Sequence, residues 1–234
     1  MTPSLPHGDV HVWTSHVESR LDELRRLRSV LSSDECERAD RFKFERHQRA
    51  FIVARATLRE VLASYLHLAP QDVAFVYGEH GKPALASADV QFNTSHSGDR
   101  IVIAVTRAAQ VGVDIEHHRP VGYLELAERF FSQREVDVLR ALDAENLATM
   151  FYRCWTRKEA YVKARGQGLS LPLRDFAVSL TTGVSPALVW NREGDSELER
   201  WELHPLALEP DYTAALVVER PVAALRRFEC RRDA

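Results

Sequence analysis

Two stretches of helical spacing, one in each half of the chain, constrain the fold most strongly. From about Glu45 to Leu66 the apolar residues recur at helical spacing, which predicts one long amphipathic helix. A second long helix is predicted from about Leu147 to Ala164, ending at Gly166, since glycine commonly follows the last turn of a helix. A shorter helix is predicted before each long one, and each begins with a capping-box pattern: Ser32 with Glu35, and Ser132 with Glu135.

Short strands are predicted around these helices. Their expected ranges are 9–13, 73–77, 90–92 and 101–106 in the first half, and 111–115, 176–180, 188–190, 201–203 and 212–218 in the second. Each half therefore offers a strand, a helix, a long helix and further strands. The pattern predicts an α+β fold of two similar lobes, residues 1–108 and 109–234, joined near Ala108–Gln110.

Composition removes several classes of protein. The 234 residues carry a net charge of −3, so bulk charge does not indicate a polyanion-binding protein. Three widely spaced cysteines fit neither a disulfide framework nor a structural zinc site. The start of the chain lacks the pattern of a signal peptide, and no apolar run reaches the length of a membrane span. We therefore expect a cytoplasmic protein with no nucleic-acid or membrane partner.

Two acids in the predicted strand that begins at residue 111 form the first candidate site. Asp114 and Glu116 are two residues apart, so on a strand their side chains point to the same face. Paired carboxylates suit a hard divalent cation such as magnesium, which also takes water and substrate phosphate oxygens as ligands. The alternative from spacing alone is a pair of solvated acids at an exposed strand end.

Three residues of the second long helix form another candidate. Trp155, Glu159 and Lys163 are spaced by four residues and share one helix face. Glu159 is placed to complete a metal site, and Lys163 to meet a phosphate group. The alternative is an ordinary Glu–Lys surface pair beside a tryptophan of the core.

Polar and basic residues elsewhere supply candidates for anion binding. The run Phe92–Gly98 places Ser95 and His96 at a predicted strand end, where they are either donors to an anionic ligand or parts of a polar turn. Lys82 lies in a Gly-Lys-Pro turn that is unlike a nucleotide-binding glycine loop. Seven further basic residues are either phosphate ligands, solvated, or paired with acids: Arg38, Arg41, Lys43, Arg46, Arg49, Arg55 and Arg59. Arg38 with Arg41, and Arg55 with Arg59, are spaced to share a helix face.

The order of these segments resembles the Sfp-type 4′-phosphopantetheinyl transferases over roughly residues 31–180. The segments are Gly81-Lys82-Pro83, Phe92-Asn93-Thr94-Ser95-His96-Ser97-Gly98, Val111-Gly112-Val113-Asp114-Ile115-Glu116, Trp155-Thr156-Arg157-Lys158-Glu159-Ala160-Tyr161-Val162-Lys163, and Gly166-Gln167-Gly168-Leu169 with Leu171-Pro172-Leu173. The resemblance implies two lobes related by pseudo-two-fold symmetry, with the active site between them, in a monomer.

The resemblance also implies roles for individual residues. Asp114, Glu116 and Glu159 would gather at Mg²⁺, and Glu159, then Glu116, is the candidate base for the attacking serine. Lys163 would support catalysis at the coenzyme A phosphates. The remaining implied contacts of coenzyme A are His96 at the phosphates, Lys82 and Ser95 at the nucleotide end, and Arg38 at a nucleotide phosphate.

The implied reaction transfers 4′-phosphopantetheine from coenzyme A to a serine of an apo acyl or peptidyl carrier protein, typically acidic around that serine. For docking of the carrier we consider the segment 120–131, which includes Tyr123, Leu126 and Phe130; the alternative is an amphipathic helix packed on the core. Two rival functions share the same residues: a coenzyme A-binding protein without transfer activity, and a metal-dependent phosphohydrolase.

Overall fold

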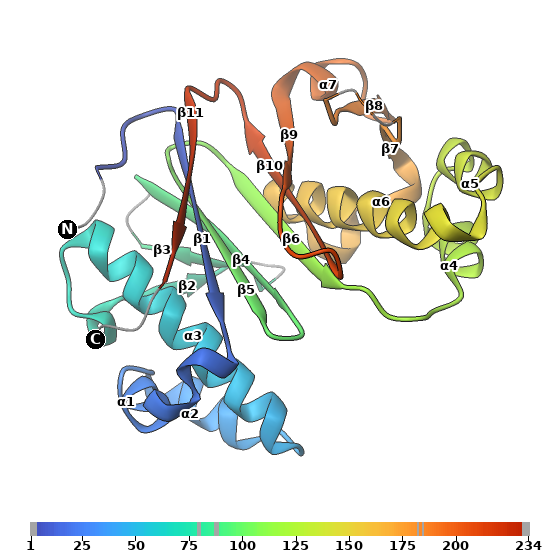
Figure 1. Cartoon of the computed structure of the whole chain (residues 1–234). Coiled ribbons are helices and arrows are strands. Elements are labelled where there is room, and N and C mark those ends of the chain that lie inside the picture. The colour runs from blue at the N-terminus through green and yellow to red at the C-terminus, as the bar shows by residue number, and fades with distance from the viewer. Residues whose placement is uncertain (1–3, 79–80, 87–88, 182, 184, 231–234) are drawn as a thin grey trace.

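The structure is a computed structural model that describes residues 4–78, 81–86, 89–181, 183 and 185–230. It has the predicted α+β fold, with strands in the middle of the molecule and one long helix on either side (Figure 1). The strands are β1 Asp9–His16, β2 Phe75–Tyr77, β3 Pro83–Leu85, β4 Val90–Ser97, β5 Arg100–Arg107, β6 Val111–His117, β7 Phe176–Val178, β8 Leu188–Asn191, β9 Trp201–Leu206, β10 Tyr212–Glu219 and β11 Ala224–Glu229. The α-helices are α1 Leu24–Ser29, α2 Ser33–Asp40, α3 Glu45–Leu66, α4 Tyr123–Phe130, α5 Gln133–Arg140, α6 Ala144–Arg165 and α7 Ser196–Arg200.

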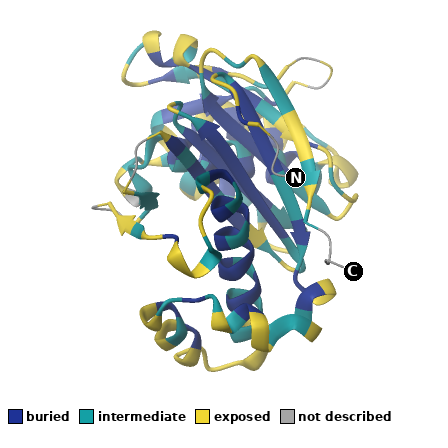
Figure 2. Ribbon diagram, turned by 90° about the vertical axis from the view of Figure 1, so that its left-hand side faces the viewer, coloured by how far each residue is buried: buried dark blue, intermediate teal, exposed yellow. Residues whose placement is uncertain are grey.

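One long helix packs against each of the two larger sheets. The first sheet has the order β11-β1-β5-β4, and α3 turns its buried face toward it (Figure 2). The second sheet has the order β6-β10-β9, and α6 lies against β6 and β10. Both helices are apolar on one stripe, so burying that stripe against a sheet is the stabilising arrangement.

The same buried ion pair recurs in the two lobes. Ser32 and Glu35 form the predicted capping box at the start of α2, and the carboxylate of Glu35 also accepts a bond from Arg59 of α3 at 2.7 Å. In the second lobe, the capping-box residue Glu135 of α5 accepts from Lys158 of α6 at 2.6 Å. Lys158 has no exposed surface, so its charge requires this partner. The repeated arrangement supports the predicted likeness of the two halves.

The last strand of the chain belongs to the first sheet. β11 pairs in parallel with β1, with Asp9 opposite Ala224 and Thr14 opposite Glu229. The sequence pattern did not predict this strand, whose residues alternate weakly and are mostly half-exposed or exposed. The predicted lobes, residues 1–108 and 109–234, stay a prediction. Residues 224–229 of the second predicted lobe lie in the sheet of the first.

Most of the predicted elements are confirmed, with one difference that affects the site. Helix α3 has the predicted bounds, and α6 ends at Arg165 with Gly166 as its C-cap. The positive φ of Gly166, 69°, is a conformation that glycine adopts more easily than other residues. β4 continues to Ser97 instead of ending near residue 92, so the motif 92–98 is mainly strand. Among the described residues, no helix combines the length and apolar character needed to cross a membrane.

Candidate active site

The two sheets meet along β4 and β6, where side chains replace the usual backbone pairing. Alternate side chains of β4 accept hydrogen bonds from alternate backbone amides of β6. The three bonds are Val113 N–H to Asn93 Oδ1 (2.9 Å), Ile115 N–H to Ser95 Oγ (3.4 Å) and His117 N–H to Ser97 Oγ (3.1 Å). Because residues two apart on a strand share a face, one run of polar residues satisfies one edge of β6.

The same serines hold the two predicted metal-binding acids. Ser95 Oγ donates to Asp114 Oδ1, and Ser97 Oγ donates to Glu116 Oε2, each at 2.9 Å. The seam between β4 and β6 therefore fixes both carboxylates. Sequence reasoning placed Ser95 at the nucleotide end of coenzyme A and gave Ser97 no role, although both belong to the quoted motif.

Close packing at Gly112 brings α6 onto β6. A Cβ atom at this position would lie 2.1 Å from the carbonyl oxygen of Ala160 and 2.3 Å from the amide nitrogen of Ala164. Neither backbone atom can move without moving the helix. The glycine of the motif is therefore required because it lets the helix that carries Glu159 and Lys163 approach the strand that carries Asp114.

Replacing Gly112 with alanine is expected to lower the free energy of unfolding by about 1–3 kcal/mol, the usual range for overpacking. Chemical denaturation measures this change. Gly78→Ala is a matched control, because its added Cβ would meet nothing nearer than the carbonyl oxygen of Lys82 at 3.8 Å. Equal stability of the Gly112→Ala and Gly78→Ala proteins would contradict the assigned role.

Lys163 reaches from α6 to the acid on β6. Its ammonium donates to Asp114 Oδ1 at 2.6 Å, to Ser95 Oγ at 3.0 Å and to the carbonyl oxygen of Val113 at 3.2 Å. Three partners match the three N–H groups of a lysine. Lys163 is thus an ion-pair partner of Asp114 in this structure, and its contact with a coenzyme A phosphate stays a prediction.

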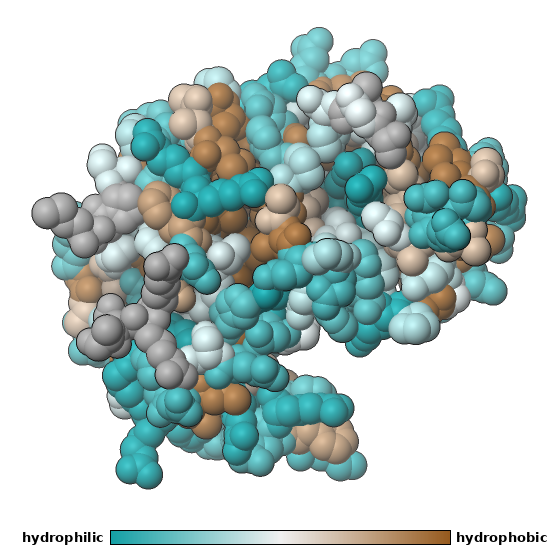
Figure 3. Space-filling view, in the orientation of Figure 1, coloured by the Kyte–Doolittle hydropathy of each residue, from teal (hydrophilic) through white to brown (hydrophobic). Residues whose placement is uncertain are grey.

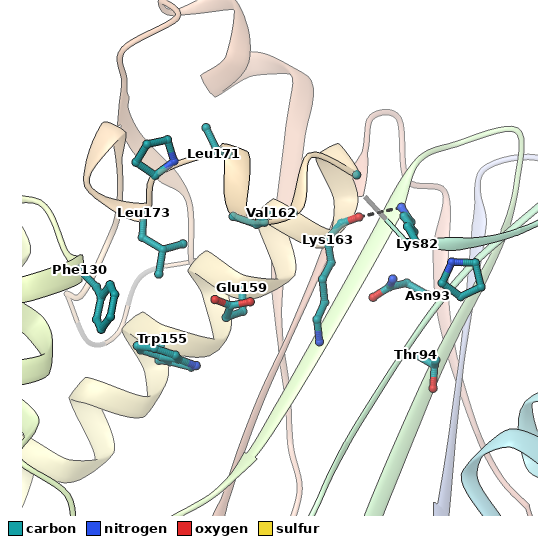
Figure 4. A pocket seen from close by; sticks show the side chains of 15 residues that line it. Lys82, Asn93, Thr94, Phe130, Trp155, Glu159, Val162, Lys163, Leu171 and Leu173 are labelled. Carbon is teal, nitrogen blue, oxygen red and sulfur yellow. Dashed lines mark hydrogen bonds between the residues drawn. The ribbon is translucent and has the colours of Figure 1, made fainter. Parts of the chain in front are cut away.

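Lys82 closes the end of the same helix. Its ammonium donates to the carbonyl oxygen of Lys163 at 2.7 Å and to that of Val111 at 3.3 Å, and Figure 4 shows the first of these bonds. Cations near a helix C-terminus satisfy its unpaired carbonyl groups. Burial lowers the pKa of Lys82 to about 8. The turn around Lys82 therefore positions α6, a role that the sequence pattern did not reveal.

The three predicted acids lie close enough to influence one another. Burial raises the pKa of Glu159, and the charge of Asp114 raises it further. The same two causes, in the same order, raise the pKa of Glu116. Oδ2 of the buried Asp114 has no hydrogen-bond partner among the described residues.

These observations fit a divalent cation. Within the described part of the chain, no three or more His, Cys, Asp or Glu side chains are already arranged around one point. Nevertheless, an unpartnered buried carboxylate oxygen and two acids whose charged forms are disfavoured make a donor set that a cation would stabilise. Oxygen donors of this kind suit magnesium better than softer metals.

A cavity of about 600 Å³ opens beside Glu159 and Lys163. At one end lie Lys82, Pro83 and Thr94; Figure 4 shows Lys163 and Glu159 in the middle. The opposite end is apolar and is formed by Phe130, Trp155, Leu171 and Leu173. The cavity thus runs from the polar end at Lys82, past the charged side chains of Lys163 and Glu159, to the uncharged pocket at Phe130 and Trp155.

A second cavity, of about 810 Å³, lies further along β4. His96 lines it together with Arg38 and with several basic and aromatic residues: Arg46, His47, Arg49, Arg119, Phe42 and Phe51. Three acids also line it, Glu18, Glu45 and Asp99, so its four arginines leave a small excess of positive charge. Desolvation by the surrounding protein, and then the charge of Lys163, lower the pKa of the exposed His96. Arg46 and Arg49 were among the basic residues that the sequence offered as phosphate ligands, whereas Arg119 was not a candidate.

The structure separates the predicted site residues into three groups. Lys82, Glu159 and Lys163 line the first cavity, Arg38 and His96 line the second, and Ser95 and Asp114 are buried in the seam near both. Glu116 lies beside Ser97 of the second cavity. The alternative interpretation is confirmed for two arginines, because Arg55 and Arg59 pair with the buried Glu35.

The aromatic and leucine side chains of the segment 120–131 pack against the core. Tyr123 contacts the ring of Phe151 at a centroid distance of 5.4 Å, and Phe130 meets Trp155 edge-on at 6.0 Å. Leu126 also packs against the C-terminal core. This helix therefore fits the second interpretation offered for it, an amphipathic helix packed on the core.

Comparison with known proteins identifies the family. Residues 110–217 match the sequence model of the 4′-phosphopantetheinyl transferase superfamily, and residues 15–108 match that of the N-terminal part of a 4′-phosphopantetheinyl transferase. The 4′-phosphopantetheinyl transferase HetI of Nostoc sp. is 38% identical over 220 residues, covering 92% of this chain and 90% of HetI. The 4′-phosphopantetheinyl transferase Sfp of Bacillus subtilis is 36% identical over 160 residues, covering 68% of this chain and 70% of Sfp.

Among solved structures, the holo-[acyl-carrier-protein] synthase of Thermotoga maritima matches with a TM-score of 0.36 and 24% identity, over 47% of this chain and 62% of that one. The sequence relatives cover far more of the chain. On that evidence, the chain belongs to the 4′-phosphopantetheinyl transferase superfamily and is a phosphopantetheinyl transferase.

Proposed function

We propose that this enzyme transfers 4′-phosphopantetheine from coenzyme A to a serine of an apo acyl or peptidyl carrier protein, using Mg²⁺ held by Asp114, Glu116 and Glu159. One observation carries the proposal: acids and Lys163 lie between a basic cavity and an apolar pocket. Coenzyme A has the same order of chemistry, with a phosphorylated nucleotide, a diphosphate and an uncharged arm.

The proposed placement of coenzyme A follows from this order. The nucleotide lies toward Lys82, Ser95 and Thr94, and its phosphates face His96 and Arg38. The diphosphate lies beside Lys163, which exchanges one of its protein partners for a phosphate oxygen. The pantetheine arm extends toward the apolar pocket of Phe130, Trp155, Leu171 and Leu173, where burial of its methyl and methylene groups stabilises the complex.

In the proposed reaction, the serine oxygen of the carrier attacks the β-phosphorus of coenzyme A. The P–O bond to 3′,5′-ADP breaks, and 3′,5′-ADP leaves. Bound magnesium would supply positive charge that neutralises the diphosphate. Lys163 adds a cation on the same side, in a partly buried position where electrostatic stabilisation is stronger than in water.

Glu159 is the proposed base for the serine proton, directly or through a water molecule, and Glu116 is the second candidate. Burial and the charge of Asp114 raise the pKa of Glu159. A carboxylate with a raised pKa accepts a proton more readily once it is ionised. Its place between the apolar pocket and Lys163 puts it where the diphosphate and the arm of coenzyme A would join.

Mass spectrometry of the carrier tests the proposed function. The protein is incubated with coenzyme A, MgCl₂ and an apo-acyl carrier protein or apo-peptidyl carrier domain. We expect the carrier to gain one phosphopantetheine group and 3′,5′-ADP to appear in equal amount. Loss of coenzyme A without a carrier would instead indicate phosphohydrolase activity, and binding of coenzyme A without any turnover would indicate a binding protein.

A further inference from the structure

The corner between α2 and α3 is an exposed surface that combines aromatic and basic side chains. Every residue from 41 to 47 is exposed. Phe44 retains 52% of its surface and Phe42 retains 37%, which places both among the exposed large apolar residues of the described chain. We call residues 41–47 the corner surface; Figure 3 shows apolar atoms among hydrophilic ones at the lower end of the molecule, where these helices meet.

This region is basic in a chain that is acidic overall. Residues 38–49 include five arginines and lysines and only two acids, whereas the whole chain has a net charge of −3. Both acids already have partners: Asp40 accepts from Arg28 at 2.8 Å, and Glu45 pairs with Arg49. Within the described structure, no acidic side chain pairs with the cations of the corner surface, Arg41, Lys43 and Arg46.

One aromatic ring of the corner surface, that of Phe44, lies among charged side chains rather than in the core. The ring of Phe44 has Lys43 Nζ at 5.7 Å and Arg46 Cζ at 5.5 Å from its centroid. Phe42 contacts Phe51 of α3 at a centroid distance of 5.5 Å. An exposed aromatic pair flanked by unpaired cations suits a partner that presents apolar side chains next to carboxylates.

The corner surface continues into the basic cavity of the active site. Phe42, Arg46 and His47 line the cavity that also contains Arg38 and His96. Figure 3 shows the molecule indented between this lower end and the C-terminal lobe. A protein bound at the corner surface therefore has the mouth of this cavity beside it.

We propose that the corner surface is the docking site for the carrier protein, and that it selects carriers whose surface combines an apolar side chain with flanking carboxylates. The inference rests on the proposed function, which requires a protein partner close to the diphosphate. Charge complementarity favours this surface over the segment 120–131, which contains two acids and one arginine. In addition, the aromatic residues of that segment, Tyr123 and Phe130, already pack against the core.

Two variants test the apolar and the charged halves of the surface. Phe44→Ala removes the exposed ring, and Lys43→Glu reverses one unpaired charge. Each has a matched control far from the corner. Leu68→Ala changes an exposed apolar residue just beyond the opposite end of α3, and Arg134→Glu changes an exposed arginine of α5 that, like Lys43, has no acidic partner among the described residues. The probes are an apo-acyl carrier protein with an acidic surface and the same carrier with those acids replaced by their amides.

We expect Phe44→Ala and Lys43→Glu each to raise KM for the acidic carrier on the order of tenfold, with KM for coenzyme A unchanged. The two control variants should match the unaltered enzyme. The rise in KM caused by Lys43→Glu should be smaller for the neutralised carrier than for the acidic one, and smaller at high salt, because the contribution of Lys43 is electrostatic.

Direct binding of the apo-carrier, measured by titration calorimetry without coenzyme A, separates this inference from the proposed function. Weaker binding by both variants supports the docking site even if the mass assay shows no transfer. Normal carrier binding and KM in both variants would overturn it while leaving transfer intact. A rise in KM for coenzyme A alone would assign the corner surface to the nucleotide, and failure of the unaltered enzyme to bind or modify either carrier would reject both proposals.

Discussion

Phosphopantetheinyl transfer by the Asp114→Asn enzyme is expected to fall by at least about a thousandfold, because the change removes a charge from the proposed metal site. Asparagine keeps the size of the side chain and an oxygen that can accept from Ser95. It cannot supply the carboxylate that pairs with Lys163 at 2.6 Å. Turnover with coenzyme A, MgCl₂ and an apo-carrier measures the loss.

The buried position of Asp114 means that Asp114→Asn should also lower the free energy of unfolding. The alternative from spacing was a solvated acid at an exposed strand end, but Asp114 is only 5% exposed and is ion-paired. Removing one partner of a buried pair leaves the other charge without compensation, so we expect the free energy of unfolding to fall by about 1–3 kcal/mol. The protein should still fold, and circular dichroism checks this.

Asp137→Asn provides the control, because Asp137 is an exposed acid on α5. It should leave turnover unchanged. Full activity of Asp114→Asn with magnesium, or of the unaltered enzyme in EDTA, would show that the proposed metal site is not needed for transfer.

Glu159→Gln is expected to lower turnover by roughly a hundred- to ten-thousand-fold while changing the affinity for coenzyme A little. Glutamine retains the size and one oxygen of the side chain but loses its basicity. If Glu159 takes the serine proton, raising the magnesium concentration should restore little of the rate. Steady-state kinetics across a metal titration measures both quantities.

The opposite result has a clear meaning for the mechanism. If Glu159 only binds the metal, saturating magnesium or manganese should recover turnover close to that of the unaltered enzyme. Such recovery would end the assignment of Glu159 as the base and leave Glu116 as the remaining candidate. Glu145→Gln, an exposed acid near the start of the same helix, should show normal kinetics throughout.

Local sequence patterns determined the framework of the site. Apolar spacing gave α3 its full extent, from Glu45 to Leu66, and the two capping boxes marked the starts of α2 and α5. The alternation of a strand placed Asp114 and Glu116 on one face, and the four-residue spacing placed Glu159 and Lys163 on one face of α6. These features depend on residues within a few positions of one another, where backbone geometry fixes the relation.

Which residues bond to these side chains could be seen only in the tertiary structure. The seam joins Ser95 and Ser97 to acids 19 residues further along the chain, and Lys82 caps a helix end 81 residues away. Nothing local distinguishes a serine that binds a carboxylate across a seam from one in a polar turn. The choice follows from which backbone groups remain unsatisfied when two sheets meet.

By itself, the sequence determined the α+β class, the two long helices, the candidate acids of the site and, through its ordered motifs, the family. Only the tertiary structure decided that β11 returns to pair with β1 and that Lys163 is bonded to Asp114. It likewise decided that Arg55 and Arg59 form ion pairs with Glu35. It also decided that Phe44 stays exposed while Phe130 packs against Trp155. The physical reason is that hydrophobic spacing encodes which face is buried, whereas the identity of the buried partner depends on contacts between segments far apart in the chain.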